Sequence, residues 1–581
     1  MVTDRSCSRN FLLVSGVLVL VGCGGGTRHF PLKDPVWRDT DLNPVNVKCE
    51  KRPTEKEPDH VSCAPDIYVS PLAWDAADNT VFRPFAKIWE VDPPKEAVNV
   101  NAFDEVPDSA WFTNRIGKKH PTLDELTRGP CAEDDMLDPE NAKAGDYVID
   151  QGKPNGASPG FRVKIGGKKK YMFKTDFARE PERPSAAAVI GTKFYHAVGF
   201  NTSCEQVQYV DTKLLKLTPG LKVTANDGVT RPFDEKALEK LLHDAVKSPD
   251  GKVRFQASAW LKGYLLGPFK YERTRSDDPN DIIPHENRRD LRGGRVLAAW
   301  LHHFDAREQN SMDAWMAVDS KNPESSPGMV KHFYLDTSDC LGSEWDWDGV
   351  SRRMGDSYLL DFQDIGVDFI TLGVIERPWE RKKRTPGMEM FGYFHWDEFD
   401  PDRWVNEYPN PAFGRATEHD NAWMARILSR FDRADIKAIV ELGKFSNPEA
   451  TEFMTEVLEQ RLRKILTRYL LKLSPIADPT VDGKETVCAT DLARRRLVRP
   501  EQEFTYEAEM SSDRGKSSLR VETKAEGGLC VTLPHVASDA APGYVVVSIK
   551  NGASKGKVEL HLYDQGPNTG YKVVGLVRPD P

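Results

Sequence analysis

The sequence predicts an α+β fold with a two-lobed domain over residues 145–476, a small all-β, sandwich-like domain over 477–581, and an extended segment before both. Three observations lead to this prediction. Strand-like and helix-like patterns follow one another between 145 and 260. A helical pattern covers 287–304, the chain is mainly helical from Asp364 to Leu473, and short alternating strands separated by turn residues follow Pro475. A chain of 581 residues is also too long for a single hydrophobic core, so several domains are expected.

The composition indicates a folded protein with an acidic balance. A hydrophobic fraction of 39% is enough for real cores, and the formal net charge is −9. This charge provides no global basic surface for nucleic acid, so no nucleic-acid partner is expected. One local basic run, Arg377–Arg384, could contact an anion, although a solvated loop is the favoured interpretation.

Residues 1–22 are typical of a secretory signal. Two arginines precede an apolar run of about 12 residues, which is too short to span ~30 Å of hydrocarbon as a helix. The ending Leu-Val-Gly-Cys resembles a bacterial lipobox, which implies cleavage before Cys23 and lipidation of its thiol. An ordinary signal peptide is the alternative. Glycine rather than aspartate after Cys23 resembles the outer-membrane type of Gram-negative lipoproteins, so the membrane is an expected partner and the expected location is the periplasmic or surface side of the outer membrane.

Cysteines outside the signal region can form disulfides in an oxidising envelope. Cys49 with Cys63 would close a small loop, and Cys488 with Cys530 would lie inside the last domain. These two pairs are favoured, although connectivity does not follow from sequence.

The elements of the chain are expected in the following order. Residues 23–144 form a tether and then an extended segment that wraps the next domain, because they are rich in Pro, Asp and Asn. The first lobe, about 145–260, contains strands, a glycine loop and one helix. The second lobe, about 261–476, contains a helix and a strand hairpin and is mainly helical beyond Asp364. The individual predictions are strands at 146–149, 161–165, 171–174, 206–210, 312–318 and 330–335, and helices at 185–198, 287–304 and 448–473.

The stretch 303–310, His-Phe-Asp-Ala-Arg-Glu-Gln-Asn, has the H-x-D-x-x-x-x-N spacing of a protein-kinase catalytic loop. In that loop the aspartate, here Asp305, accepts a proton from the acceptor hydroxyl, and the asparagine, here Asn310, holds a metal ion. Asp336 follows the strand at 330–335 and is the candidate for the second metal ligand, with Asp339 as a competing one.

Lys174 lies 14 residues after Gly160 at the end of a strand, where it could hold nucleotide phosphates. Glu182, or its rival Glu180, could pair with this lysine. Three glycines of the preceding loop could let the backbone approach phosphates, although their G-x3-G-x3-G spacing departs from G-x-G-x-x-G. They are Gly152, Gly156 and Gly160.

Together these residues resemble the protein-kinase-like superfamily, closest to its divergent HipA-type and CotH-type branches. The resemblance implies Mg²⁺ and ATP as cofactors and phosphoryl transfer to a hydroxyl acceptor. A catalytically inactive, kinase-shaped scaffold is the alternative, with the β domain binding an envelope protein or a glycan. No motif favours a hydrolase.

A second resemblance covers nearly the whole mature chain. It is to a family of uncharacterised lipoproteins from myxobacteria and related soil bacteria, which implies an envelope location but no activity. The segments that carry it are 105–115, 159–161, 277–281 and 408–413.

Overall fold

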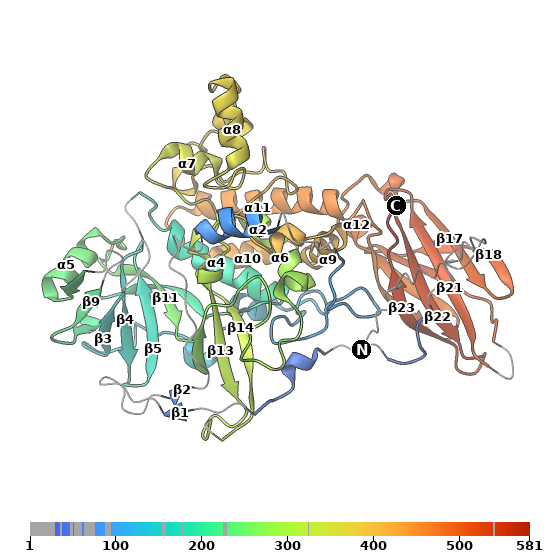
Figure 1. The fold of residues 1–581 in the computed structure, drawn as a ribbon, viewed down its shortest axis with the longest axis horizontal. Helices are drawn as coiled ribbons and strands as arrows, with labels where there is room; N and C mark the ends of the chain where they lie inside the picture. Colours follow the sequence, from blue (N-terminus) through green and yellow to red (C-terminus); the bar gives the residue numbers. More distant parts are fainter. Residues whose placement is uncertain are drawn as a thin grey trace, which may run out of the picture.

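The computed structural model describes residues 29–34, 38–46, 50–51, 61–62, 76–87, 95–153, 158–176, 179–224, 229–323, 325–537 and 541–581. Helices and β-sheets both occur in these ranges, which confirms the prediction of a mixed α and β protein. Figure 1 shows one sheet at the left end of the long axis, helices in the middle and the C-terminal strands at the right end. Within the same ranges no helix has the length and apolar character needed to cross a membrane. The predictions for Cys23, Cys49, Cys63 and Gly156 lie outside the described residues.

The first sheet has six strands in the order β7-β11-β5-β4-β3-β8. One face buries aromatic and aliphatic side chains beneath helix α5 (Glu235–Asp244), and the other face carries polar residues such as Lys174 and Arg254. Helix α4 (Arg183–Val198) follows β5 and contacts β7 and β11. Helix α5 and strand β11 were not predicted. The strands are β3 (Tyr147–Gly152), β4 (Gly160–Ile165), β5 (Lys169–Lys174), β7 (Glu205–Val210), β8 (Leu215–Leu217) and β11 (Val253–Ala259), and a separate ribbon pairs β9 (Lys222–Thr224) with β10 (Thr230–Pro232).

The middle of the molecule is a helical core around α6 (Arg289–Leu301) and α11 (Pro448–Tyr469). The buried Trp300 of α6 donates an indole N–H to the Leu458 carbonyl of α11 at 2.8 Å, which joins the two helices directly. Helix α6 ends three residues earlier than the sequence predicted, because His302 adopts the left-handed conformation that caps it. The neighbouring helices are α9 (Glu418–Leu428) and α10 (Arg433–Glu441), with α7 (Asp348–Arg353) and α8 (Phe362–Thr371) projecting from the top of Figure 1.

A second sheet has four strands, and two of them adjoin the loops of the candidate site. Strands β13 (Ser311–Ala317) and β14 (Gly328–Tyr334) form an antiparallel hairpin, with β12 (Tyr264–Gly267) beside β13 and β6 (Asn201–Thr202) parallel to β14. Because β13 starts where residues 303–310 end and β14 stops just before Asp336, the hairpin brings these two stretches to the same end of the sheet.

The C-terminal strands form two sheets that bury a common apolar core. The disulfide between Cys488 and Cys530 joins the adjacent strands β16 and β20, and it is one of the two pairs favoured from the sequence. The first sheet contains β15 (Ile476–Asp482), β16 (Thr486–Asp491), β20 (Gly528–Thr532) and β19 (Val521–Thr523). The second contains β18 (Gly515–Leu519), β17 (Tyr506–Ser512), β21 (Gly543–Asn551), β22 (Lys557–Asp564) and β23 (Tyr571–Val577), and the short helix α12 is Leu492–Arg495.

The segment before α3 (Leu123–Arg128) contacts both the helical core and the C-terminal sheets. Phe30 packs edge-on against His561, and the Tyr563 hydroxyl donates to the Phe30 carbonyl at 2.9 Å. A Cβ at Gly575 would lie 2.7 Å from the Phe30 ring, so the bare glycine makes room for this aromatic side chain. Other short elements of the segment are β1 (Glu50–Lys51), β2 (Val61–Ser62) and α2 (Arg83–Lys87).

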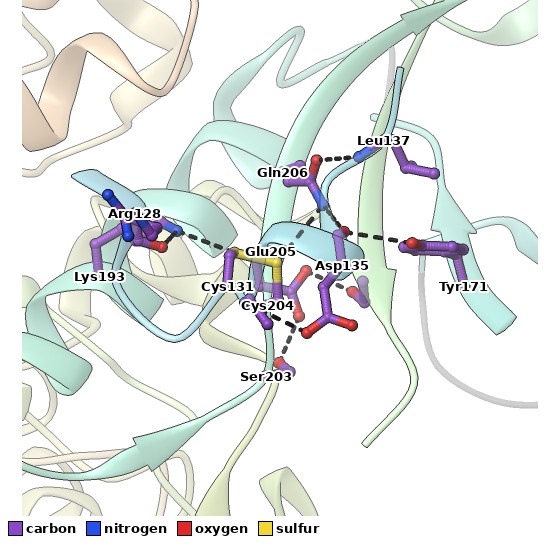
Figure 2. Close-up of a disulfide and its surroundings, with 12 residues drawn as sticks. Arg128, Cys131, Asp135, Leu137, Tyr171, Lys193, Ser203, Cys204, Glu205 and Gln206 are labelled. Carbon is purple, nitrogen blue, oxygen red and sulfur yellow. Dashed lines mark hydrogen bonds between the residues drawn. A yellow bond between two sulfur atoms is a disulfide. The ribbon is translucent and has the colours of Figure 1, made fainter. Parts of the chain in front are cut away.

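A second disulfide, not predicted from the sequence, joins Cys131 to Cys204 at the start of β7 (Figure 2). Around it, Lys193 of α4 donates to the Arg128 carbonyl at 2.6 Å, and the Gln206 side chain donates to the Asp135 carbonyl at 2.8 Å. The stretch 128–137 is therefore fastened to both the sheet and α4.

Candidate functional site

Lys174 and Asp336 form an ion pair between the first sheet and the end of β14. The Lys174 Nζ lies 2.9 Å from the Asp336 Oδ1, although the residues are 162 positions apart in the sequence. Asp336 has a left-handed backbone, with φ of 48°, and also accepts a hydrogen bond from the Ser338 hydroxyl at 2.6 Å. The two sheets therefore present a cation and a carboxylate to each other.

The charges of Lys174 and Asp336 each shift the pKa of the other side chain. Burial alone would raise the pKa of Asp336, but the Lys174 charge and the Ser338 hydroxyl outweigh it and hold that pKa well below its usual range. Burial alone would lower the pKa of Lys174, but the charges of Asp336 and Glu205 raise it instead. Both groups are consequently ionised at neutral pH.

Asp305 lies between a buried histidine and a second carboxylate. Its Oδ1 is 3.3 Å from the Nε2 of His303, and its backbone N–H donates to the Asp339 Oδ2 at 3.2 Å. Burial and the nearby charge of Asp305 raise the pKa of Asp339 well above its usual range, which favours the protonated form of Asp339. The Asp305 side chain remains 20% exposed, so a ligand can reach it from solvent.

Asn310 links the Asp305 loop to the Asp336 strand. Its side-chain amide donates to the Asp305 carbonyl at 2.8 Å, and its own carbonyl accepts from the Leu335 N–H at 2.9 Å. With its amide nitrogen engaged in this way, the amide oxygen of Asn310 is the atom of that side chain that a cation could bind. A carboxylate and an amide oxygen are ligands that fit Mg²⁺.

The loop that follows Asp336 is held by helix α4. Arg183, the first residue of that helix, donates to the carbonyls of Ser338 at 2.6 Å and Cys340 at 3.0 Å. Thr337 donates to the Ala188 carbonyl at 2.9 Å, and a Cβ on Gly191 would lie 2.7 Å from Thr337. Sequence reasoning missed Arg183. The available signal was a cation in the first turn of a helix, which opposes the helix dipole and therefore indicates another partner.

Glu182 does not pair with Lys174, so this prediction was wrong. Its carboxylate accepts from the Ser446 backbone N–H at 2.8 Å and from the Ser446 hydroxyl at 3.1 Å, in the loop before α11. The rival Glu180 forms an ion pair with Arg183 at 2.8 Å. Both acids are thus engaged with the helical half, and the second carboxylate that acts on Lys174 is Glu205 of β7.

The two described glycines of the loop have close backbone or side-chain neighbours. A Cβ on Gly160 would lie 2.3 Å from the Phe173 carbonyl oxygen in the neighbouring strand. A Cβ on Gly152 would lie 2.2 Å from the Val223 side chain. These close approaches account for both glycines by packing, so their role in phosphate binding stays a prediction.

Two further groups hold the Asp305 loop and the first sheet in place. The side chains of Asn406 and Asn410 both donate to the Ala306 carbonyl, at 3.3 and 3.4 Å, and Glu407 forms an ion pair with Arg307. The fully buried Arg254 of β11 donates to the Gly443 and Lys444 carbonyls at 2.6 and 2.7 Å and to the Ser185 hydroxyl at 2.8 Å. Arg254 therefore connects β11 with α4 and with the loop between α10 and α11.

A cavity of about 340 Å³ lies elsewhere, beneath the basic run noted in the sequence. His302, Trp404 and Arg461 line it together with residues 381–386, but Lys174, Asp305 and Asp336 do not. Most cations of the run have acidic partners: Arg381 pairs with Glu376, Lys382 with Asp356, and Arg384 with Glu344. The run is thus largely neutralised by its own surroundings.

Comparison with known proteins adds a distant likeness to a solved structure. No family model matches the chain, and no curated protein matches it. Among solved structures, the chain is similar to the crystal structure of a Helicobacter pylori proinflammatory kinase, CtkA, with 13% sequence identity over 56% of this chain and 96% of that chain, and a TM-score of 0.29. A likeness this distant has no bearing on the activity of the chain.

Proposed function

We propose that the chain is an envelope lipoprotein with a kinase-like, two-lobed domain that transfers a phosphoryl group from a nucleotide to a hydroxyl acceptor. The observation that carries the proposal is the contact between Lys174 and Asp336 at 2.9 Å, with Asp305 and Asn310 at the same end of the β13–β14 hairpin. The polar face of the first sheet and the loops at the end of the second sheet supply these groups from opposite sides.

Each residue has a distinct role in this proposal. Asp305 accepts the proton of the acceptor hydroxyl, because it is a partly exposed carboxylate on a fixed loop. Lys174 donates to the nucleotide phosphates, and Asp336 with the Asn310 oxygen holds Mg²⁺, which would neutralise charge on the phosphates. Binding of nucleotide and cation would replace the direct contact between Lys174 and Asp336 with contacts to the ligand.

Nucleotide binding tests the proposal directly. We expect ATP with Mg²⁺ to raise the thermal midpoint of the protein, since a ligand at 100 times its Kd adds about 2.7 kcal/mol to the free energy of unfolding. Asp336→Asn and Lys174→Met should each remove most of this shift, whereas Lys168→Met, an exposed lysine at the turn of the same β4–β5 hairpin, should retain it. No shift with ATP, ADP or GTP, with Mg²⁺ or Mn²⁺, would contradict the proposed activity.

A catalytically inactive scaffold is the second candidate function. The observation that favours it is the absence of a pairing between Lys174 and the acids of the α4 region, since Glu182 binds Ser446 instead. In that case the kinase-like domain would be a rigid platform, and the C-terminal β domain would bind an envelope protein or a glycan. The nucleotide titration separates the two functions.

Attachment to the membrane is proposed through a lipid on Cys23, on the basis of the lipobox-like ending of the signal region. We expect the wild-type protein to fractionate with outer membranes and Cys23→Ser to lose that attachment. Cys340→Ser, which changes a buried free cysteine, is the matched control and should stay with the membrane. Equal fractionation of Cys23→Ser and wild type would exclude the anchor.

A further inference from the structure

We propose that Lys153 is a second phosphate-binding lysine of this site, and that the site therefore selects ligands with at least two linked phosphates. This inference rests on the proposed function and deepens it, because it defines the class of ligand that the Lys174 site would take.

The strand register puts the two lysines in one row. Gly160 of β4 lies directly opposite Lys174 of β5. On its other side, the register of β3 and β4 places Lys153 opposite Gly160, and the Lys153 N–H donates to the Gly160 carbonyl at 3.1 Å. Residues directly opposite each other in neighbouring strands point to the same face of a sheet. Lys153 and Lys174 thus lie on the same face, on either side of Gly160.

Gly160 leaves the space between the two lysines without a side chain. Neighbouring strands are about 4.8 Å apart, so the two lysine backbones are separated by roughly 10 Å, a gap that two long side chains can narrow from both sides. An added Cβ at Gly160 would collide with the neighbouring strand, which is why no larger residue fits there.

The Lys153 ammonium has a carbonyl partner but no acid partner. It donates to the Ser158 carbonyl at 2.7 Å, and across the described part of the chain it makes no salt bridge. Burial and the positive charge of Lys174 lower the pKa of Lys153 to about 8, while Asp336 opposes that effect. A partly desolvated ammonium beside another lysine is stabilised by an anion.

The positions of the two lysines favour an extended anion over a single phosphate. Lys174 already pairs with Asp336 and is also acted on by Glu205, whereas Lys153 has no carboxylate partner among the described residues. A cation held at Asp336 would add positive charge between them and the ligand. One phosphate of a ligand would contact Lys174 and that cation. The neighbouring phosphate would then lie across Gly160, within reach of Lys153, as in a nucleoside diphosphate or triphosphate.

Titration calorimetry of ATP, ADP and AMP with Mg²⁺ tests this inference. We expect Lys153→Met to weaken the binding of ATP and ADP about tenfold or more, which corresponds to one lost charge-assisted hydrogen bond, and to change the affinity for AMP far less. Lys153→Arg should recover most of the affinity, and Lys168→Met should behave like wild type. ATP binding that is equally tight in wild type and Lys153→Met would overturn the inference and leave the proposed function intact.

Inorganic tripolyphosphate without metal provides a test that does not depend on the nucleotide. We expect it to bind wild type and to bind both Lys153→Met and Lys174→Met more weakly. If tripolyphosphate shows this pattern but no nucleotide binds, the lysine pair is supported and the proposed phosphotransfer from a nucleotide fails. Equal binding of tripolyphosphate to all three proteins would overturn the lysine pair. Unchanged thermal midpoints without ligand would exclude misfolding as the cause of a loss.

Discussion

Asp305→Asn is expected to reduce phosphoryl transfer by about a hundredfold to ten-thousandfold while nucleotide affinity stays within about threefold of wild type, because general-base catalysis contributes in that range. Asparagine has nearly the same shape as aspartate but cannot accept the acceptor proton. The backbone bonds of residue 305 to Asp339 and Asn310 do not involve its side chain, so the loop should keep its position. ADP release from ATP under single-turnover conditions measures the effect.

A remote carboxylate serves as the control for this variant. Asp346 is 88% exposed and lies outside the Lys174 site, so Asp346→Asn should turn over like wild type. Full turnover by Asp305→Asn would exclude Asp305 as the base. Loss of nucleotide binding in the same variant would show instead that Asp305 positions the loop.

Asp104→Asn should lower the free energy of unfolding by at least about 3 kcal/mol, because its carboxylate joins three buried arginines. It lies 3.1 Å from Arg426 of α9 and 2.6 Å from Arg578 after β23, and it also pairs with Arg289 of α6. Burial would raise the pKa of Asp104, but the three guanidinium charges outweigh it and hold that pKa below its usual range. The carboxylate is therefore charged at neutral pH, and its stabilising effect is lost only as the pH falls through that lowered pKa.

Urea unfolding at neutral pH measures the effect of Asp104→Asn. Asparagine is the suitable replacement because Asp104 has a left-handed backbone, with φ of 59°, which asparagine tolerates. Asp34→Asn removes an exposed carboxylate that pairs with Lys572 and should change stability by less than about 1 kcal/mol. Equal unfolding midpoints for wild type and Asp104→Asn would show that the charge of Asp104 is not needed to stabilise the three buried arginines in the folded state.

The parts of the fold that sequence reasoning placed well have strong local patterns. The strands at 161–165 and 171–174, the hairpin of β13 and β14, and the long helix α11 each repeat apolar residues at the period of their structure. Helix α5 has no fully buried residue and no strong start signal beyond Asp234, so the sequence does not predict it. Local periodicity thus predicts the elements that bury many apolar side chains.

The contacts that sequence reasoning missed depend on tertiary placement. Cys131 and Cys204 are 73 residues apart, and no local pattern indicates that they meet. The orientation of α4 turns Glu182 toward Ser446 and away from Lys174, which a position just before a helix does not reveal. The spacing within residues 303–310 indicates Asp305 and Asn310, and their places at strand ends indicate Lys174 and Asp336. The structure brings these segments together.

With the proposed lipid on Cys23, the packing of Phe30 would limit how far the C-terminal domain can lie from the membrane. Phe30 is held on β22 and β23 by the Tyr563 hydroxyl and the space over Gly575, so the described chain begins as a fixed part of the C-terminal domain. Only six residue steps separate Cys23 from His29, which span at most about 20 Å when extended. A lipid on Cys23 would keep the C-terminal domain close to the bilayer. The first sheet, which carries Lys174 on β5, lies at the other end of the long axis in Figure 1. Such an orientation would direct the site toward acceptors beyond the lipid headgroups.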